Sequence, residues 1–235
     1  MKSQLNTSYA TILNLYEKYQ DDLFKIYPLS LHYFQSKRHE QKEALRLLEA
    51  KLRLLKEWGY IAGDKLAAKG NFARNVYGYE LILAELYAQG VLEELDEFGL
   101  GVLAAAVVFE PRKNQRLALG LSKTARTLRR ISEEAYAQVK HKEQRLRIYP
   151  FSKLPAFHLA SSMEAWLRGT NFEKILGMGD TDEGEVVRYF RMGIQLLREM
   201  NNPETASPGL QQRLKEAIRV INRGVVDAEK QLREG

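Results

Sequence analysis

The chain of 235 residues contains no cysteine. Disulfide bonds, thiolate catalysis and cysteine-ligated zinc or iron–sulfur centres are therefore excluded. Long apolar runs are also missing, because the best one, residues 100–109, is far shorter than the ~18 to 20 residues that cross a bilayer. The N-terminal stretch lacks the apolar core of a signal peptide. We therefore expect a cytoplasmic protein with no membrane partner.

Motifs of catalysis and metal binding are absent as well. The sequence has no G-x-x-x-x-G-K-[ST] loop to bind phosphates and no DExH run to hold magnesium. Its four histidines, at positions 32, 39, 141 and 158, are scattered without the spacing of metal ligands. No G-x-S-x-G element marks a nucleophile. We predict no catalytic residue, no metal site and no cofactor in this chain.

The net charge of +6 is concentrated in one segment. Residues 110–153 hold twelve Lys and Arg against four Asp and Glu, a local charge of +8, so the other residues sum to 6 − 8 = −2. This concentration favours an anionic partner. Within the segment, residues 121–147 are predicted to form a long helix with Lys123, Arg126 and Arg130 on one side. These three side chains either meet backbone phosphates or form a solvated face, and the pattern favours neither.

Apolar residues recur with helical spacing over most of the chain, so we predict a mainly α fold. A first helix is expected within residues 3–19 and a long one over residues 29–58. Two short apolar pieces around the Gly-Asp pair at 63–64 predict a small β-hairpin. Helix, long helix and hairpin are compatible with a winged-helix-like unit in residues 1–77. The apolar helical runs that follow predict an all-α helical bundle in residues 78–235.

The stretch 180–200 is predicted to be one helix with two different faces. The residues of its apolar stripe, which must be buried, are Val187, Phe190, Ile194 and Leu197. The same spacing, one position later and about 100° around the helix, gives a polar face of Arg188, Arg191, Gln195 and Arg198. Asp180 with Glu183 matches a capping box at the start. The arginine face is either a solvated flank or a surface that contacts an anionic chain.

Several separate blocks of the sequence, in the same order, resemble one family. The run 183–191, EGEVVRYFR, followed by Leu-Leu-Arg at 196–198, is similar to the signature helix of the DSHCT region. Residues 80–86, 166–172 and 223–226 resemble further blocks of that region. The DSHCT region is the C-terminal module of superkiller-type and exosome-associated DExH-box RNA helicases. The resemblance covers nearly the whole chain.

In that family the equivalent helix lies under the motor, contacts single-stranded nucleic acid as it is drawn through, and is called the ratchet helix. The resemblance carries this role over to Arg188 and Arg191, while Gln195 and Arg198 are added because they share the face. ATP and magnesium would belong to motor domains that this sequence lacks. The arch-shaped insertion of these helicases is also missing, because only ten residues, rich in charge, separate Phe34 from Leu45.

The resemblance implies the non-catalytic C-terminal region of a superkiller-like, ATP-dependent RNA helicase, or a stand-alone relative of it. Such a region would bind single-stranded RNA or DNA and support helicase motor domains, in cis or in trans. Two alternatives stay open: a helical protein-interaction scaffold, and a winged-helix DNA-binding module that uses residues 1–77. Salt-dependent binding to an oligonucleotide separates the three hypotheses.

Overall fold

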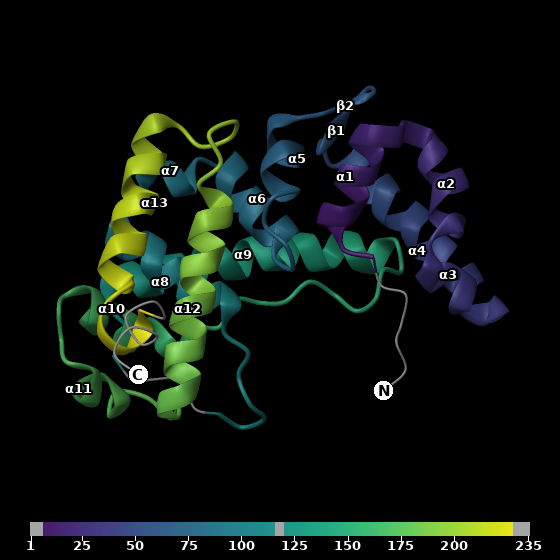
Figure 1. The fold of residues 1–235 in the computed structure, drawn as a ribbon. Coiled ribbons are helices and arrows are strands. Elements are labelled where there is room, and N and C mark those ends of the chain that lie inside the picture. Colours follow the sequence, from purple (N-terminus) through teal and green to yellow (C-terminus); the bar gives the residue numbers. More distant parts are fainter. Residues whose placement is uncertain (1–6, 116–119, 228–235) are drawn as a thin grey trace. The chain divides into compact units, whose positions relative to one another are not determined.

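A computed structural model describes residues 7–115 and 120–227 of the chain (Figure 1). Residues 3–6, where the first predicted helix would begin, lie outside the described residues. The described helices greatly outnumber the strands, which form one two-stranded antiparallel sheet. The prediction of a mainly α fold is therefore confirmed. In the part of the chain that the structure describes, no helix is long and apolar enough to cross a membrane.

The described residues form two compact units. Unit 1 comprises the residues up to Ala88 together with Tyr136–Ser152, and unit 2 comprises Gln89–Ala135 and the residues from Lys153 onward. One long helix, α9 (Lys123–Arg145), contributes to both units. The domain boundary predicted after residue 77 stays a prediction.

Unit 1 begins with helices packed around a small hairpin. Its elements before α9 are α1 (Tyr9–Tyr19), η1 (Gln20–Asp22), α2 (Leu23–Ile26), η2 (Tyr27–Leu29), α3 (Leu31–Gln35), α4 (Arg38–Glu57), β1 (Ile61–Ala62), β2 (Lys65–Leu66), α5 (Ala68–Ala73) and α6 (Glu80–Ala88). The Ser8 side chain caps α1 by accepting a hydrogen bond from the Thr11 amide at 3.0 Å. Ile12 and Leu13 of α1 are fully buried, so this helix packs into unit 1 through its apolar side chains.

The single long helix predicted for residues 29–58 is wrong. The chain forms α3 and α4 instead, because the backbone is extended at Ser36 and Lys37. The Glu40 carboxylate accepts a hydrogen bond from the Lys37 amide at 2.9 Å and so stabilises a new helix start. The pattern of apolar residues could not predict this break between the helices, because the cap leaves the spacing of the leucines unchanged.

The predicted hairpin is confirmed. Strands β1 and β2 pair antiparallel with Ile61 opposite Leu66, and the turn contains the Gly-Asp pair. Gly63 has a φ of 60°, a left-handed conformation that glycine adopts without steric cost. The amide of Ala67 then donates to the carbonyl of Tyr60 at 3.0 Å, which ties the strands to the start of α5.

The C-terminal part of α9 is held in unit 1 by a buried carboxylate. The side chain of Glu143, only 1% exposed, accepts hydrogen bonds from the Tyr9 hydroxyl and the Ser152 hydroxyl, each at 2.9 Å, and from the Ser152 amide at 2.8 Å. Burial raises the pKa of Glu143, although these hydrogen bonds and the nearby Lys51 oppose the shift. The folded chain therefore holds a proton on Glu143 more tightly than the unfolded chain does.

This pKa shift predicts a pH dependence with a definite sign. Because the pKa of Glu143 is raised on folding, its contribution to stability is fully present below the ordinary value of 4.5 and is lost as pH rises through the folded value. The free energy of unfolding of the wild type relative to Glu143→Gln, measured in urea at several pH values, should therefore fall as pH rises from about 4.5. A difference that grows with pH would contradict the assignment.

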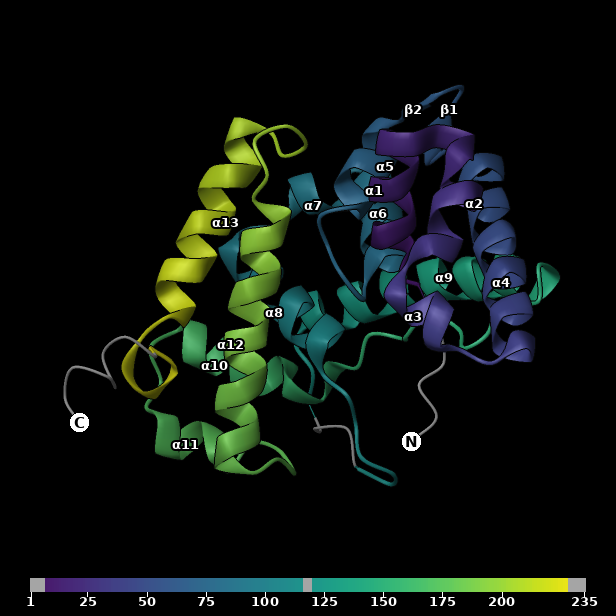
Figure 2. The same cartoon turned by 45° about the vertical axis from the view of Figure 1, so that its right-hand side comes forward.

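Unit 2 is built around one apolar helix. Its elements other than α9 are α7 (Val91–Glu94), α8 (Glu97–Val108), η3 (Phe157–Leu159), α10 (Ala160–Leu167), α11 (Phe172–Leu176), α12 (Glu183–Met200), α13 (Pro208–Ile221) and η4 (Gly224–Val226). Helix α8 is buried from Gly99 to Val108, and α10, α12 and α13 pack against it. Helices α12 and α13 run side by side in both views (Figures 1 and 2).

Candidate nucleic-acid interface

Helix α12 begins later than predicted. Its N-cap is Asp182, whose backbone is extended, and its first residue is Glu183. The expected capping box with Asp180 is therefore wrong. The carbonyl of Asp180 instead accepts a hydrogen bond from the Gln115 side chain at 2.5 Å, as part of the loop that precedes the helix. The acidic residues of the first turn, Glu183 and Glu185, still lie at the positive end of the helix dipole.

The apolar face of α12 is fixed against the core of unit 2. Phe190, Ile194 and Leu197 are at most 3% exposed, as the stripe predicts, whereas Val187 is only half-buried. Gly193 lies against Ala104 and Ala105 of α8, where a methyl group would already be in van der Waals contact. The small residues therefore let the two helices approach closely, and the opposite face of α12 is turned away from α8.

Arg188 lies on the outward face of α12. Its side chain is 58% exposed, its Nη2 lies 4.0 Å from the Glu185 carboxylate, and its guanidinium sits 4.4 Å above the ring of Tyr189. The long ion pair is of the kind that contributes little at a surface. The guanidinium is therefore held near its own helix by the aromatic ring, while its donors stay accessible to solvent.

Arg191 has a different environment. It is half-buried, its Nε donates to the carbonyl of Val226 at 2.9 Å, and its Nη2 donates to the carbonyl of Val225 at 3.0 Å. These bonds attach the η4 turn to α12. A strand contact by Arg191 stays a prediction, but its guanidinium already has a structural role in positioning the C-terminal turn.

Gln195 and Arg198 are both exposed on the same side of α12 as Arg188. The amide of Gln195 donates to the Glu199 carboxylate at 3.2 Å. For Arg198, no described residue forms an ion pair or a hydrogen bond with the side chain. The exposed polar face of α12 thus consists of Arg188, Gln195 and Arg198, each about one or two turns from the next.

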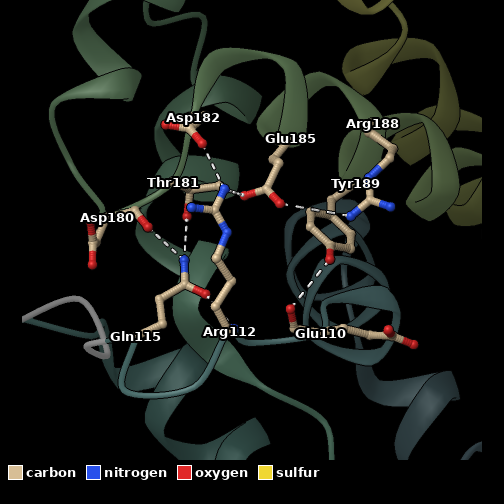
Figure 3. A network of polar contacts seen from close by, with 9 residues as sticks. All are labelled: Glu110, Arg112, Gln115, Asp180, Thr181, Asp182, Glu185, Arg188 and Tyr189. Carbon is tan, nitrogen blue, oxygen red and sulfur yellow. Dashed lines mark hydrogen bonds and ion pairs between the residues drawn. The ribbon is translucent and has the colours of Figure 1, made fainter.

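A polar network that sequence reasoning missed fixes the start of α12 (Figure 3). The Nη2 atom of Arg112 lies 2.6 Å from both the Asp182 and the Glu185 carboxylates. The hydroxyl of Tyr189 donates to the carbonyl of Glu110 at 3.3 Å. The loop after α8 is thereby joined to the first two turns of α12. The only signal for Arg112 in the sequence was that it belongs to the many basic residues of 110–153.

The second predicted set lies on the part of α9 that belongs to unit 2. Lys123, Arg126 and Arg130 are all exposed. Arg130 pairs with Glu134 at 2.7 Å, whereas no described residue pairs with the side chains of Lys123 or Arg126. Their placement on one side of α9 agrees both with a solvated face and with a phosphate contact. These three residues are therefore weaker candidates for contacting phosphates than the residues of α12.

Among the described residues, no three His, Asp or Glu side chains come together in a group that could hold a metal ion. His158 is half-buried beside Phe109, with ring centroids 5.2 Å apart, and burial lowers its pKa. This histidine therefore packs against the ring of Phe109.

The sequence of the chain matches one protein family. The DSHCT (NUC185) domain matches residues 63–229, which is most of the chain and includes α12. The chain therefore belongs to the DSHCT family, and the family resemblance seen in the sequence is confirmed.

Two of the relatives described below are named as RNA helicases. The chain is 27% identical to "ATP-dependent RNA helicase mtr4" of Schizosaccharomyces pombe over 229 residues, which is 90% of this chain and 20% of that protein. It is 28% identical to "Exosome RNA helicase MTR4" of Homo sapiens, over 83% of this chain and 20% of that protein. A third relative, "mRNA transport homolog 4" of Caenorhabditis elegans, is 28% identical over 84% of this chain. The chain thus spans about a fifth of the length of these relatives.

Proposed function

We propose that this chain is the non-catalytic C-terminal region of a superkiller-like RNA helicase and binds single-stranded RNA along α12. The exposed face of Arg188, Gln195 and Arg198 carries the proposal, because it offers charged and amide donors in a row on a helix whose other side is fixed in the core. Membership of the DSHCT family and similarity to proteins named as RNA helicases support it. In this proposal α12 is a ratchet helix.

The chain's partners follow from the same proposal. Helicase motor domains, in cis or in trans, would bind ATP and magnesium, and this region would support them against the strand. Unit 1, with α1, α4 and the β1–β2 hairpin, is proposed as the winged-helix-like element. The cytoplasmic location expected from the sequence stays a prediction.

A protein-interaction role has one specific observation in its favour. Leu29 and Phe34, in the short helices before α4, are each 81% exposed. A partner protein that covered these two side chains would remove their apolar surface from water. The motor domains would be such a partner under the main proposal. A separate adaptor protein would be the partner under the scaffold hypothesis.

Binding to a fluorescein-labelled 20-nucleotide oligouridylate, followed by anisotropy over a range of salt concentrations, tests the proposal. The variant Arg188→Gln/Arg198→Gln removes two positive charges from the open face and leaves Arg191, which holds the η4 turn, untouched. If both arginines contact phosphates, the log–log salt slope should fall by about 1.4, and affinity should fall about 25-fold at ~0.1 M salt.

The matched control is Lys215→Gln/Arg219→Gln, which removes two charges from exposed positions of α13. Binding by the control should stay within about twofold of the wild type under the same conditions. Equal slopes for the α12 variant and the wild type would refute the proposal. An oligothymidylate of the same length, measured alongside, shows whether the strand can be DNA as well as RNA.

A further inference from the structure

A second basic site lies within unit 1 and is made of residues other than those that the family resemblance points to. A shallow groove of about 250 Å³ runs between α4 and the turn that follows α9. The residues that line it are Arg46, Glu49, Ala50, Arg53, Arg145, Leu146 and Arg147. Arg46 and Arg53 are seven residues apart and therefore share one face of α4. The other two arginines reach the groove from α9 and its end.

Glutamates of α4 hold three of these guanidiniums in place. Glu57 accepts a hydrogen bond from the Nε of Arg53 at 2.6 Å and also pairs with Arg145. Arg46 donates to Glu43 from Nε at 2.9 Å and from Nη2 at 2.6 Å. Each guanidinium has five N–H donors, so these contacts leave others available. The arginines are thus oriented before any ligand arrives.

Arg147 lies in the turn that follows α9. Its backbone has a φ of 54°, and Arg46 donates from Nη2 to its carbonyl at 3.0 Å, which fixes the turn. The Arg147 side chain is exposed, and no described residue pairs with it. The positive charge of Arg147 is therefore exposed at the groove, on a turn that Arg46 of α4 holds in place.

The charge of the groove remains positive after its internal pairs are counted. Four arginines and Glu49 line it, which gives 4 − 1 = +3. Glu43 and Glu57, which pair with lining arginines, lower this to 3 − 2 = +1. A local excess of guanidinium in a concave surface attracts anions, and the planar fork of arginine matches a phosphate group.

We propose that this groove binds a phosphate group of a single-stranded nucleic acid, as a contact separate from α12. The lining favours a phosphate over an acidic peptide, because Ala50 and Leu146 are its only apolar residues and a peptide would need pockets for its side chains. The inference deepens the proposed function in that it uses the same strand, but the groove residues and the α12 residues can be changed independently.

The test uses the full chain and the labelled 20-nucleotide oligouridylate. In the variant Arg53→Gln/Arg147→Gln, both changed residues are exposed, and Arg46 is left in place because it holds the turn. We expect the log–log salt slope to fall by about 0.7 for each phosphate that the variant no longer binds, up to about 1.4. The control Arg53→Lys/Arg147→Lys keeps both charges and should retain the wild-type slope. Far-UV circular dichroism verifies that each variant is folded.

The outcomes separate this inference from the proposed function. A fall in slope for the groove variant, with none for Arg188→Gln/Arg198→Gln, supports the groove and refutes the α12 interface. The reverse result overturns the groove and leaves α12 standing. Two further probes, a labelled ten-residue polyglutamate and inorganic phosphate, identify other occupants. If the groove variant loses binding to either of them while its oligouridylate slope is unchanged, the inference is overturned.

Discussion

Trp166→Ala is expected to destabilise unit 2 by about 3–5 kcal/mol, the usual cost of removing a buried tryptophan. The side chain is 2% exposed, and its Nε1 donates to the carbonyl of Ile221 at 2.9 Å. The ring also packs near Phe190 of α12, with centroids 6.2 Å apart, and beneath the Arg223 guanidinium at 3.5 Å. Such a loss is a large share of the ~5–15 kcal/mol of a typical domain.

Urea unfolding followed by circular dichroism measures this effect. The chain has only two tryptophans, so Trp58 remains in the variant and its fluorescence reports unit 1 separately. Trp166→Phe keeps an aromatic ring but removes the N–H donor, and its cost should be smaller, about 1–3 kcal/mol. If Trp166→Ala unfolds at the same urea concentration as the wild type, the residue does not anchor the core of unit 2.

The two faces of α12 could be predicted because a helix repeats its environment every 3.6 residues. That regularity placed Phe190 and Ile194 in the core and left Arg188 and Arg198 exposed, as the structure shows. The hairpin could be predicted as well, since a Gly-Asp turn is a local signal. The start of α12 could not, because the residue that caps the helix depends on how the preceding loop is held by Arg112.

The other features that could not be predicted depend on contacts between residues far apart in the sequence. The partners of Arg191 are carbonyls 34 and 35 residues further along the chain, which no local pattern encodes. The basic groove also depends on residues that are far apart in the sequence. The spacing of Arg46 and Arg53 shows that they share a face, but Arg147 joins them from 101 residues beyond Arg46. Charge counted along the sequence found an excess in residues 110–153 without showing that part of it completes a groove on α4.

Gly70→Ala is expected to destabilise unit 1 by about 1–3 kcal/mol or more, the cost of forcing extra atoms into a packed interior. A Cβ atom at Gly70 would lie 2.1 Å from the Tyr60 carbonyl oxygen and 3.0 Å from its carbon. Both atoms belong to the backbone, so no rotation of a side chain relieves the clash. The same oxygen accepts the Ala67 hydrogen bond that joins the hairpin to α5, and the substitution should therefore separate these two elements.

The matched control is Gly184→Ala in the first turn of α12, where nothing lies within 4 Å of the added Cβ. That substitution should stabilise unit 2 by about 0.5–1 kcal/mol, because alanine loses less backbone entropy than glycine on entering a helix. Urea unfolding of the two variants, read by circular dichroism and by the fluorescence of Trp58 and Trp166 together, should give shifts of opposite sign. A neutral Gly70→Ala would mean that α5 can move away from Tyr60 at no cost, and that the hairpin is not held as the close contact implies.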